Sequence, residues 1–222
     1  MSAMRVSDVL NAVLDVLFPR RCPFCRKLLD GKRLICRDCA KSLPRVHETV
    51  QSRRYANIAE CHSVLYYEGA VRESLLRYKF GGAAAYADAY AALMEAYLDD
   101  APIDCDVVTW TPLSRKRLRR RGYDQARLLA EPVAEHLGVP CAQLLVKTRN
   151  NPAQSGTKGR DKRAANVSGV YSPAPGTSAA GLRVLLVDDI VTTGATLSEC
   201  ARVLKAAGAD EIFALTLAMT RD

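Results

Sequence analysis

The second half of the chain alternates between short apolar runs and longer segments with helical periodicity. The expected strands span 107–110, 142–146, 184–187 and 212–217, and the expected helices span about 123–137 and 194–207. Strands that alternate with helices in this way predict right-handed crossovers and a parallel sheet covered by helices on both faces. The predicted fold class is therefore α/β and Rossmann-like, with ligands binding at the carboxyl ends of the strands.

The segment before residue 107 predicts one more strand and two helices. The expected strand spans 62–67, and the expected helices span 69–80 and 83–98. Residues 44–55 are polar and basic and lack periodicity, so we interpret them as a linker that precedes a domain at 57–222. Pro132 falls inside the helix predicted at 123–137, where it either kinks that helix or marks a new start.

Residues 1–20 predict an amphipathic helix. Apolar residues recur there at helical spacing: Val6, Val9, Leu10, Val13, Leu14 and Leu17. Asp8, Asn11 and Asp15 interrupt the segment, which argues against a signal peptide. The helix either packs on its own protein or offers a face to a membrane or a partner. Because no run of 18 or more uncharged apolar residues occurs, we expect no transmembrane helix and a cytoplasmic protein.

Four of the eight cysteines form a C-x2-C-x10-C-x2-C array. They are Cys22, Cys25, Cys36 and Cys39. Two such pairs can close a tetrahedral thiolate shell around zinc, and four thiolates leave no open coordination position, so the sequence predicts a structural zinc module within 21–56. A disulfide pair lacks a secretory signal, and a redox dithiol does not need two such pairs. The other four cysteines are predicted to be buried small apolar residues: Cys61, Cys105, Cys141 and Cys200.

An acidic pair and a Thr/Gly-rich turn follow the apolar run at 184–187. The pair is Asp188 and Asp189, and the turn contributes Thr192, Thr193, Gly194, Ala195 and Thr196. Because the turn opens a helix, its backbone N–H groups and three hydroxyls converge where the helix dipole is positive, which favours binding of a monophosphate. The adjacent carboxylates can accept hydrogen bonds from a vicinal diol, such as that of ribose, and can hold Mg2+ through water.

Two other interpretations of this strand and turn are weaker. The run Val-Leu-Leu-Val-Asp-Asp is also similar to the opening strand of response-regulator receiver domains. A receiver needs roughly a hundred residues after that strand, whereas only 33 follow Asp189. A purely structural strand-to-helix turn would leave two carboxylates without partners, which is unfavourable if they are buried.

Positive charge concentrates in two stretches, within a net charge of +8. One run places six cations in seven positions: Arg115, Lys116, Arg117, Arg119, Arg120 and Arg121. Like charges at this density repel, so a phosphate-rich partner, either pyrophosphate or nucleic acid, is favoured over a solvated helix start. The cysteine module carries further cations, which either grip phosphates or keep a small module solvated: Arg26, Lys27, Lys32, Arg33, Arg37 and Lys41.

The acidic pair with its Thr/Gly turn looks like the phosphoribosyl pyrophosphate motif of type I phosphoribosyltransferases. Four further motifs accompany it and the cysteine module: Tyr67-Glu68-Gly69, Lys79-Phe80-Gly81-Gly82, Thr111-Pro112-Leu113 and Arg121-Gly122-Tyr123-Asp124-Gln125. Together they resemble the ComF family, from about residue 20 to the end of the sequence. ComF proteins are phosphoribosyltransferase-like proteins associated with DNA uptake during natural competence in bacteria.

The resemblance implies a role for each part of the site. Asp188 and Asp189 would hold the ribose diol with Mg2+, and Thr192–Thr196 would hold the 5′-phosphate. The loop after Trp110 would face pyrophosphate, and the polar loop at 148–163 would close over it. This sequence departs from the family pattern within that pyrophosphate loop, where Trp110-Thr111-Pro112 replaces a Val-Pro-type dipeptide, and at Asp124, which replaces a more usual Asn.

Two functions stay open. On the first, the protein binds phosphoribosyl pyrophosphate and handles single-stranded DNA during uptake, together with competence machinery proteins at the inner membrane, and Tyr55 and Tyr123 are available to stack on bases. On the second, it is an active transferase acting on an amine or nucleobase acceptor. No general base can be nominated, because His47 lies in the linker, His62 on a strand and His136 near a helix end.

Overall fold

The computed structural model describes residues 19–46, 55–148 and 169–221. The chain divides into two compact units, one ending at Leu43 and the other beginning at Pro44. The amphipathic helix expected at 1–20 lies outside the described residues apart from its last two positions, as do His47, most of the linker and most of the loop at 148–163. The first unit contains the four-cysteine module and the second contains the α/β domain.

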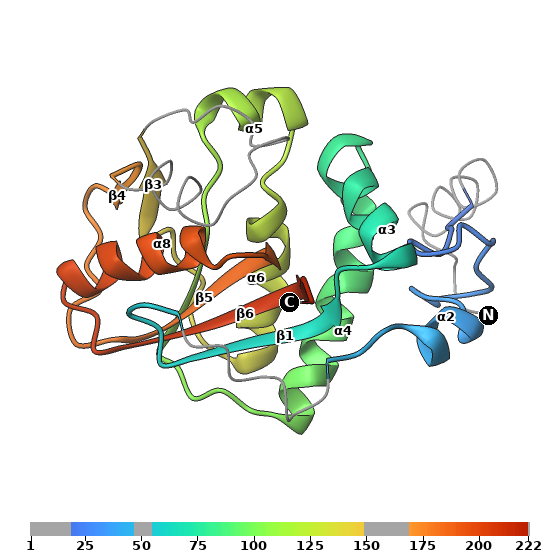
Figure 1. The fold of residues 1–222 in the computed structure, drawn as a ribbon, viewed down its shortest axis with the longest axis horizontal. Coiled ribbons are helices and arrows are strands. Elements are labelled where there is room, and N and C mark those ends of the chain that lie inside the picture. Colours follow the sequence, from blue (N-terminus) through green and yellow to red (C-terminus); the bar gives the residue numbers. More distant parts are fainter. Residues whose placement is uncertain (1–18, 47–54, 149–168, 222) are drawn as a thin grey trace, which may run out of the picture. The chain divides into compact units, whose positions relative to one another are not determined.

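A four-stranded sheet in the order β1-β6-β5-β2 forms the centre of the larger unit (Figure 1). Its strands are β1 (Glu60–Tyr66), β2 (Val107–Trp110), β5 (Arg183–Val191) and β6 (Glu211–Met219). Every neighbouring pair is parallel. The predicted α/β fold with a parallel sheet is therefore confirmed.

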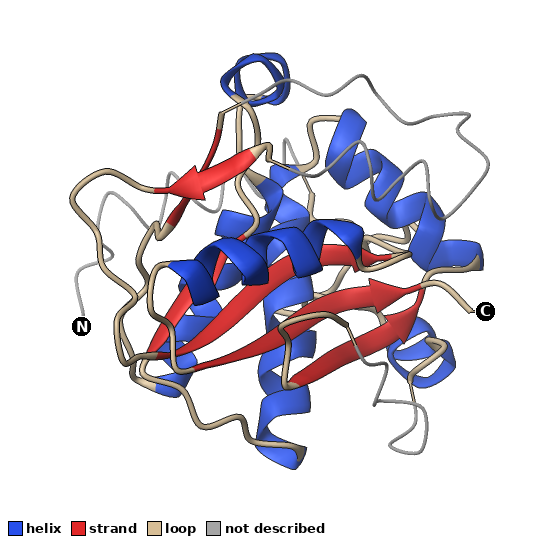
Figure 2. Cartoon of the chain, turned by 60° about the vertical axis from the view of Figure 1, so that its left-hand side comes forward, coloured by secondary structure: helices blue, strands red, loops and turns tan. Residues whose placement is uncertain are grey.

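Helices cover both faces of this sheet, as Figure 2 shows. They are α4 (Ala87–Asp100), α6 (Gln125–Leu137) and α8 (Ala195–Ala206). Val184 and Leu186 of β5 belong to the buried cluster that contains the apolar side of α8, whereas Leu185 and Val187 alternate to the opposite face, where α6 contacts β5. A strand buried on both faces explains why residues 184–187 form an uninterrupted apolar run.

The other elements surround the carboxyl ends of the strands. They are α3 (Gly69–Phe80), the short 3-10 helix η2 (Ala84–Tyr86), α5 (Arg115–Arg121), β3 (Leu145–Lys147) and β4 (Tyr171–Pro173). None of the helices in the described ranges is long and apolar enough to cross a membrane.

The strand predicted at 142–146 differs from the one observed. Only residues 145–147 form a strand, and β3 pairs antiparallel with β4 in a separate two-stranded sheet. The chain touches the parallel sheet beforehand through a single bridge between Val108 and Cys141. The prediction missed this arrangement because the partner strand at 171–173 is too short to show a period.

The basic run and the helix predicted after it form two helices, α5 and α6. Residues 115–121 form a separate helix, because the Ser114 side chain accepts a hydrogen bond from the backbone N–H of Arg117 and Gly122 ends the helix in the left-handed conformation (φ 83°). Helix α6 then starts at Gln125 and runs through Pro132. Pro132 therefore does not mark a new helix start.

Candidate functional site

A cavity of about 180 Å3 lies at the carboxyl ends of β2 and β5. Asp188, Asp189 and Ile190 of β5, together with Thr196 of α8, line part of its wall. The remaining wall comes from α3, α5, the loop after β2, the start of α6 and the β3–β4 pair. This is the edge where parallel α/β sheets bind ligands.

The acidic pair lies within the strand and not after it. β5 continues to Val191, so the expectation that the strand ends at Val187 is wrong. Burial, and then the neighbouring charge of Asp189, raise the pKa of Asp188 to about 7, while Lys79 and a hydrogen bond from Thr111 act in the opposite direction. Asp189 is 5% exposed, and its carboxylate lies 2.9 Å from the Lys79 ammonium. Asp188 and Asp189 therefore form an acidic part of the cavity wall, and Lys79 neutralises part of its charge.

Gly194 holds the turn between β5 and α8. Its φ of +74° is in the left-handed region, and a Cβ built on it would lie 2.0 Å from the ring of Tyr55. Only glycine satisfies both constraints. Thr196 reaches the cavity lining, whereas Thr192, Thr193, Gly194 and Ala195 form the adjacent turn without lining the cavity.

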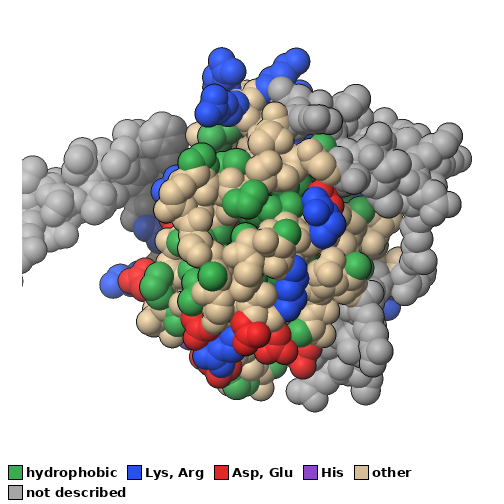
Figure 3. All heavy atoms as spheres, turned by 90° about the vertical axis from the view of Figure 1, so that its left-hand side faces the viewer, with side chains coloured by type: hydrophobic (Ala, Val, Ile, Leu, Met, Phe, Trp, Pro, Cys, Tyr) green, Lys and Arg blue, Asp and Glu red, His purple; other side chains and the backbone are tan. Residues whose placement is uncertain are grey.

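The six cations of the basic run divide between two faces of α5. Arg117 and Arg121 line the cavity, and the Arg121 guanidinium donates to Oε1 of Gln125 at 2.6 Å. The other four side chains are exposed: Arg115, Lys116, Arg119 and Arg120. Figure 3 shows Lys and Arg side chains projecting at the top of the molecule, where α5 lies. One short helix thus presents cations both to the cavity and to solvent.

Asp124 organises the loop that follows β2. Its carboxylate accepts a hydrogen bond from the backbone N–H of Leu113 at 3.0 Å and another, at 3.5 Å, from that of Arg127 in the first turn of α6. Thr111, Pro112 and Leu113 line the cavity. Each carboxylate oxygen accepts one of these hydrogen bonds, whereas an Asn side chain offers a single acceptor oxygen, so the departure at Asp124 supplies a second acceptor.

Lys79, Lys147 and Tyr171 line the cavity, although none of them was assigned to the site from the sequence. Lys79 belongs to a motif quoted for the family resemblance, but the motif carries no sign of its role. Lys147 donates a hydrogen bond to the Tyr171 hydroxyl at 3.0 Å, and burial lowers the pKa of this lysine. The pairing of β3 with β4 brings Lys147 and Tyr171 together, and no local sequence pattern reveals that pairing.

The two histidines within the described residues lie elsewhere. His62 contacts the Tyr97 hydroxyl and Glu60, and His136 forms an ion pair with Asp99. As far as the described residues go, the cavity lining contains neither histidine nor glutamate. Three of the four remaining cysteines are buried as expected, and Cys141 is half-buried.

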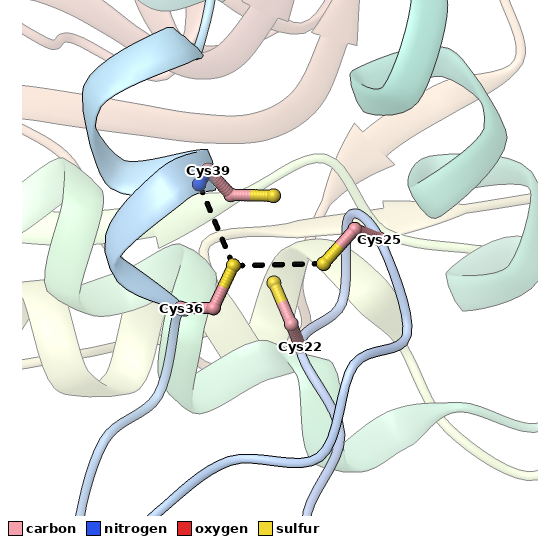
Figure 4. A group of neighbouring side chains, drawn as sticks. All are labelled: Cys22, Cys25, Cys36 and Cys39. Atoms are coloured by element: carbon pink, nitrogen blue, oxygen red, sulfur yellow. Dashed lines mark hydrogen bonds between the residues drawn. The ribbon is translucent and has the colours of Figure 1, made fainter.

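The four array cysteines converge in the smaller unit, as Figure 4 shows. Their sulfur atoms all lie within 4.8 Å of one another, and Cys25 Sγ is 3.5 Å from Cys36 Sγ. A tetrahedral zinc ion with bonds of about 2.3 Å separates its sulfur ligands by about 3.8 Å, so the four thiols fit zinc. Cys36 caps α2 (Arg37–Ser42), which places Cys39 in the first turn of that helix.

Comparisons with known proteins agree with both units. Residues 124–221 match the phosphoribosyl transferase domain family, and residues 13–51 match the double zinc ribbon domain family. The larger unit is thus a type I phosphoribosyltransferase domain, and a four-cysteine zinc ribbon precedes it.

Curated proteins that are similar to the chain include two competence proteins and an adenine phosphoribosyltransferase. Competence protein ComFC of Bacillus subtilis (strain 168) is 31% identical over 184 residues, which cover 82% of this chain and 70% of that protein. Competence protein ComFC of Streptococcus pneumoniae is 26% identical over 93% of this chain and 84% of that protein. Adenine phosphoribosyltransferase of Mycobacteroides abscessus is 55% identical over 42 residues, which are 19% of this chain and 24% of that protein. The chain belongs to the ComF family.

Proposed function

We propose that this ComF-family protein binds phosphoribosyl pyrophosphate together with Mg2+ in the cavity at the carboxyl end of β5. One observation carries the proposal: two adjacent carboxylates, of which Asp189 is buried and Asp188 half-buried, share a cavity with Arg117, Arg121 and Lys147. Carboxylates suit a diol, and clustered cations suit phosphates. A ligand that combines a ribose diol with several phosphates matches both halves of this cavity.

Each part of the wall has a task on this proposal. Asp188 and Asp189 accept hydrogen bonds from the 2- and 3-hydroxyls, and the turn that opens α8 holds the 5′-phosphate through its backbone N–H groups and Thr196. Arg117 and Arg121 face the pyrophosphate. Mg2+, held through water by the carboxylates, supplies charge neutralisation for the pyrophosphate.

Calorimetric titration tests this assignment. Phosphoribosyl pyrophosphate with Mg2+ is titrated into the full chain, into Asp189→Asn and into Asp100→Asn, in which an exposed carboxylate at the end of α4 is replaced. We expect the first variant to lose at least about tenfold in affinity, because a charge-assisted hydrogen bond contributes about 1.5–3 kcal/mol. Equal affinity for all three proteins contradicts the assignment.

We further propose that the protein handles single-stranded DNA during DNA uptake, in the cytoplasm and with competence machinery proteins at the inner membrane as partners. Its curated relatives carry the name of competence proteins, and the solvent face of α5 presents four exposed cations. The zinc ribbon carries six more exposed Lys and Arg side chains, with a structural zinc ion holding its four thiolates: Arg26, Lys27, Lys32, Arg33, Arg37 and Lys41.

The packing of Tyr55 and Tyr123 gives no support to base stacking by these two rings. Tyr55 lies against Gly194, and the Tyr123 hydroxyl donates to the carbonyl of Tyr78. The binding that we propose is therefore dominated by phosphate contacts and should weaken steeply with salt. Mobility-shift titrations at two salt concentrations test it, and an affinity that stays the same when Arg119 and Arg120 become Ala refutes this role of α5.

An active phosphoribosyltransferase is the second candidate, and one observation favours it. Burial raises the pKa of Asp124, and it raises that of Asp188 to about 7, so Asp188 in the cavity wall is suited to accept a proton near neutral pH. The acceptor would be an amine or a nucleobase. Steady release of pyrophosphate with one member of an acceptor panel supports this candidate, and release with none of them refutes it for that panel.

A further inference from the structure

Two cations of the cavity, Lys79 and Lys147, come from outside the basic run. Lys79 lies in the last turn of α3, and its Nζ is 2.9 Å from Oδ1 of Asp189. The two side chains are 22% and 7% exposed, and both line the cavity. An ammonium group has three N–H donors, so Lys79 can bind Asp189 and still face whatever occupies the cavity.

The neighbours of Lys79 fix its position. Tyr78 is fully buried, its hydroxyl donates to the carbonyl of Gln125 at 2.9 Å, and its own carbonyl accepts from the Tyr123 hydroxyl. These two hydrogen bonds attach the end of α3 to the segment between α5 and α6. The Arg121 guanidinium also lies 5.0 Å from the centre of the Phe80 ring. The end of α3 is therefore held beside the cavity, and from this anchored backbone the Lys79 side chain reaches Asp189.

The charges around Asp189 explain what this lysine does. Asp188 and Asp189 are adjacent, and Asp124 lines the same cavity, so the acidic pair needs a positive partner when no ligand is present. A divalent cation could fill that need, but Lys79 already does so. A bound pyrophosphate would offer Lys79 a second anion with more charge than one carboxylate.

We propose that Lys79 is an exchange residue: it neutralises Asp189 in the empty cavity and moves to the pyrophosphate of the ligand, which frees Asp189 for the ribose and Mg2+. This inference rests on the proposed function. It makes metal binding conditional on the phosphate ligand, since the lysine and a divalent cation compete for one carboxylate. It also selects ligands that bring enough negative charge to attract the lysine away.

The proposal predicts effects of opposite sign from one substitution. In Lys79→Met, which keeps most of the length and removes the charge, Asp189 loses its competitor, so Mn2+ alone should bind about tenfold more tightly. The same variant loses a charge-assisted contact with pyrophosphate, so phosphoribosyl pyrophosphate with Mn2+ should bind at least about tenfold more weakly. Lys79→Arg keeps the charge and should lie close to the wild type in both measurements.

Titration calorimetry of the full chain, with Mn2+ alone and then with phosphoribosyl pyrophosphate at fixed Mn2+, measures both affinities. Arg72→Ala, an exposed cation of the same helix, is the matched control, and circular dichroism checks that each variant is folded. If Lys79→Met binds the ligand as well as the wild type, or if both affinities change in the same direction, the exchange role is refuted while the proposed function stands. If the wild type itself binds no phosphoribosyl pyrophosphate, the proposed function is refuted and the exchange role with it.

Discussion

Replacing Gly194 with Ala should lower the free energy of unfolding through two contributions, both of which glycine avoids in the turn before α8. The first cost is the left-handed backbone, which is about 1–2 kcal/mol for a residue with a Cβ. The second is overlap with Tyr55, since the new Cβ would lie 2.0 Å from two carbons of that ring. Displacing a packed ring adds about 1–3 kcal/mol. We expect a total loss of about 3 kcal/mol in the free energy of unfolding.

Two further variants isolate these costs. Gly176 has the same φ of +74°, but a Cβ there would meet nothing within 4 Å, so Gly176→Ala should lose only the backbone contribution. In a Tyr55→Ala background the ring is gone, so Gly194→Ala should also lose only that contribution. The difference between the two backgrounds is a coupling energy of about 1–3 kcal/mol.

Urea denaturation provides the measurement. The single tryptophan, Trp110, is 6% exposed in β2, so its fluorescence reports unfolding of the larger unit without interference from the zinc ribbon. Equal losses for Gly194→Ala in the two backgrounds would mean that contact with the ring is not the cause. Affinity for phosphoribosyl pyrophosphate should fall in Gly194→Ala even under conditions where the variant is folded, because the N–H groups of the turn are displaced.

Three other predictions follow from the charges and the cysteines. Because the folded-state pKa of Asp188 is raised to about 7, its destabilising effect is absent below the unfolded value of about 3.9 and complete above the folded value. Asp188→Asn should therefore gain about 4 kcal/mol in the free energy of unfolding over the wild type between pH 4 and pH 8, and an equal difference at both pH values in urea denaturation would contradict this. Removing zinc with a chelator should expose residues 19–43 to trypsin while the Trp110 transition is kept; an unchanged digestion pattern would show that the metal does not hold this unit together. Arg117→Ala should lower phosphoribosyl pyrophosphate affinity about tenfold, whereas Arg120→Ala should lower only DNA affinity. Calorimetry measures the first affinity and mobility shifts the second. A loss of phosphoribosyl pyrophosphate affinity in Arg120→Ala as large as that in Arg117→Ala would contradict the separation of inner from outer cations.

The central features of the domain could be predicted because each depends on local pattern. A continuous apolar run marked the buried strand β5, and a Thr/Gly turn after an acidic pair marked the entry to α8. The local pattern could not predict the part of the cavity wall that comes from α3 and β3. Lys79 and Lys147 lie 68 residues apart in the sequence, and the fold alone places both in one wall. The split of the basic run into inner and outer cations likewise depends on where Ser114 starts α5.

The place of β6 in the sheet has a consequence for how the chain is made. β6 lies between β1 and β5 and pairs with both, and it follows them in the sequence. On the ribosome, β1 therefore has no neighbour in the sheet until residues 211–219 have been synthesised, about 150 residues later. Until then the backbone N–H and C=O groups of β1 and β5 that later pair with β6 stay open to wrong partners, so rapid closure by β6 protects the nascent chain from aggregation.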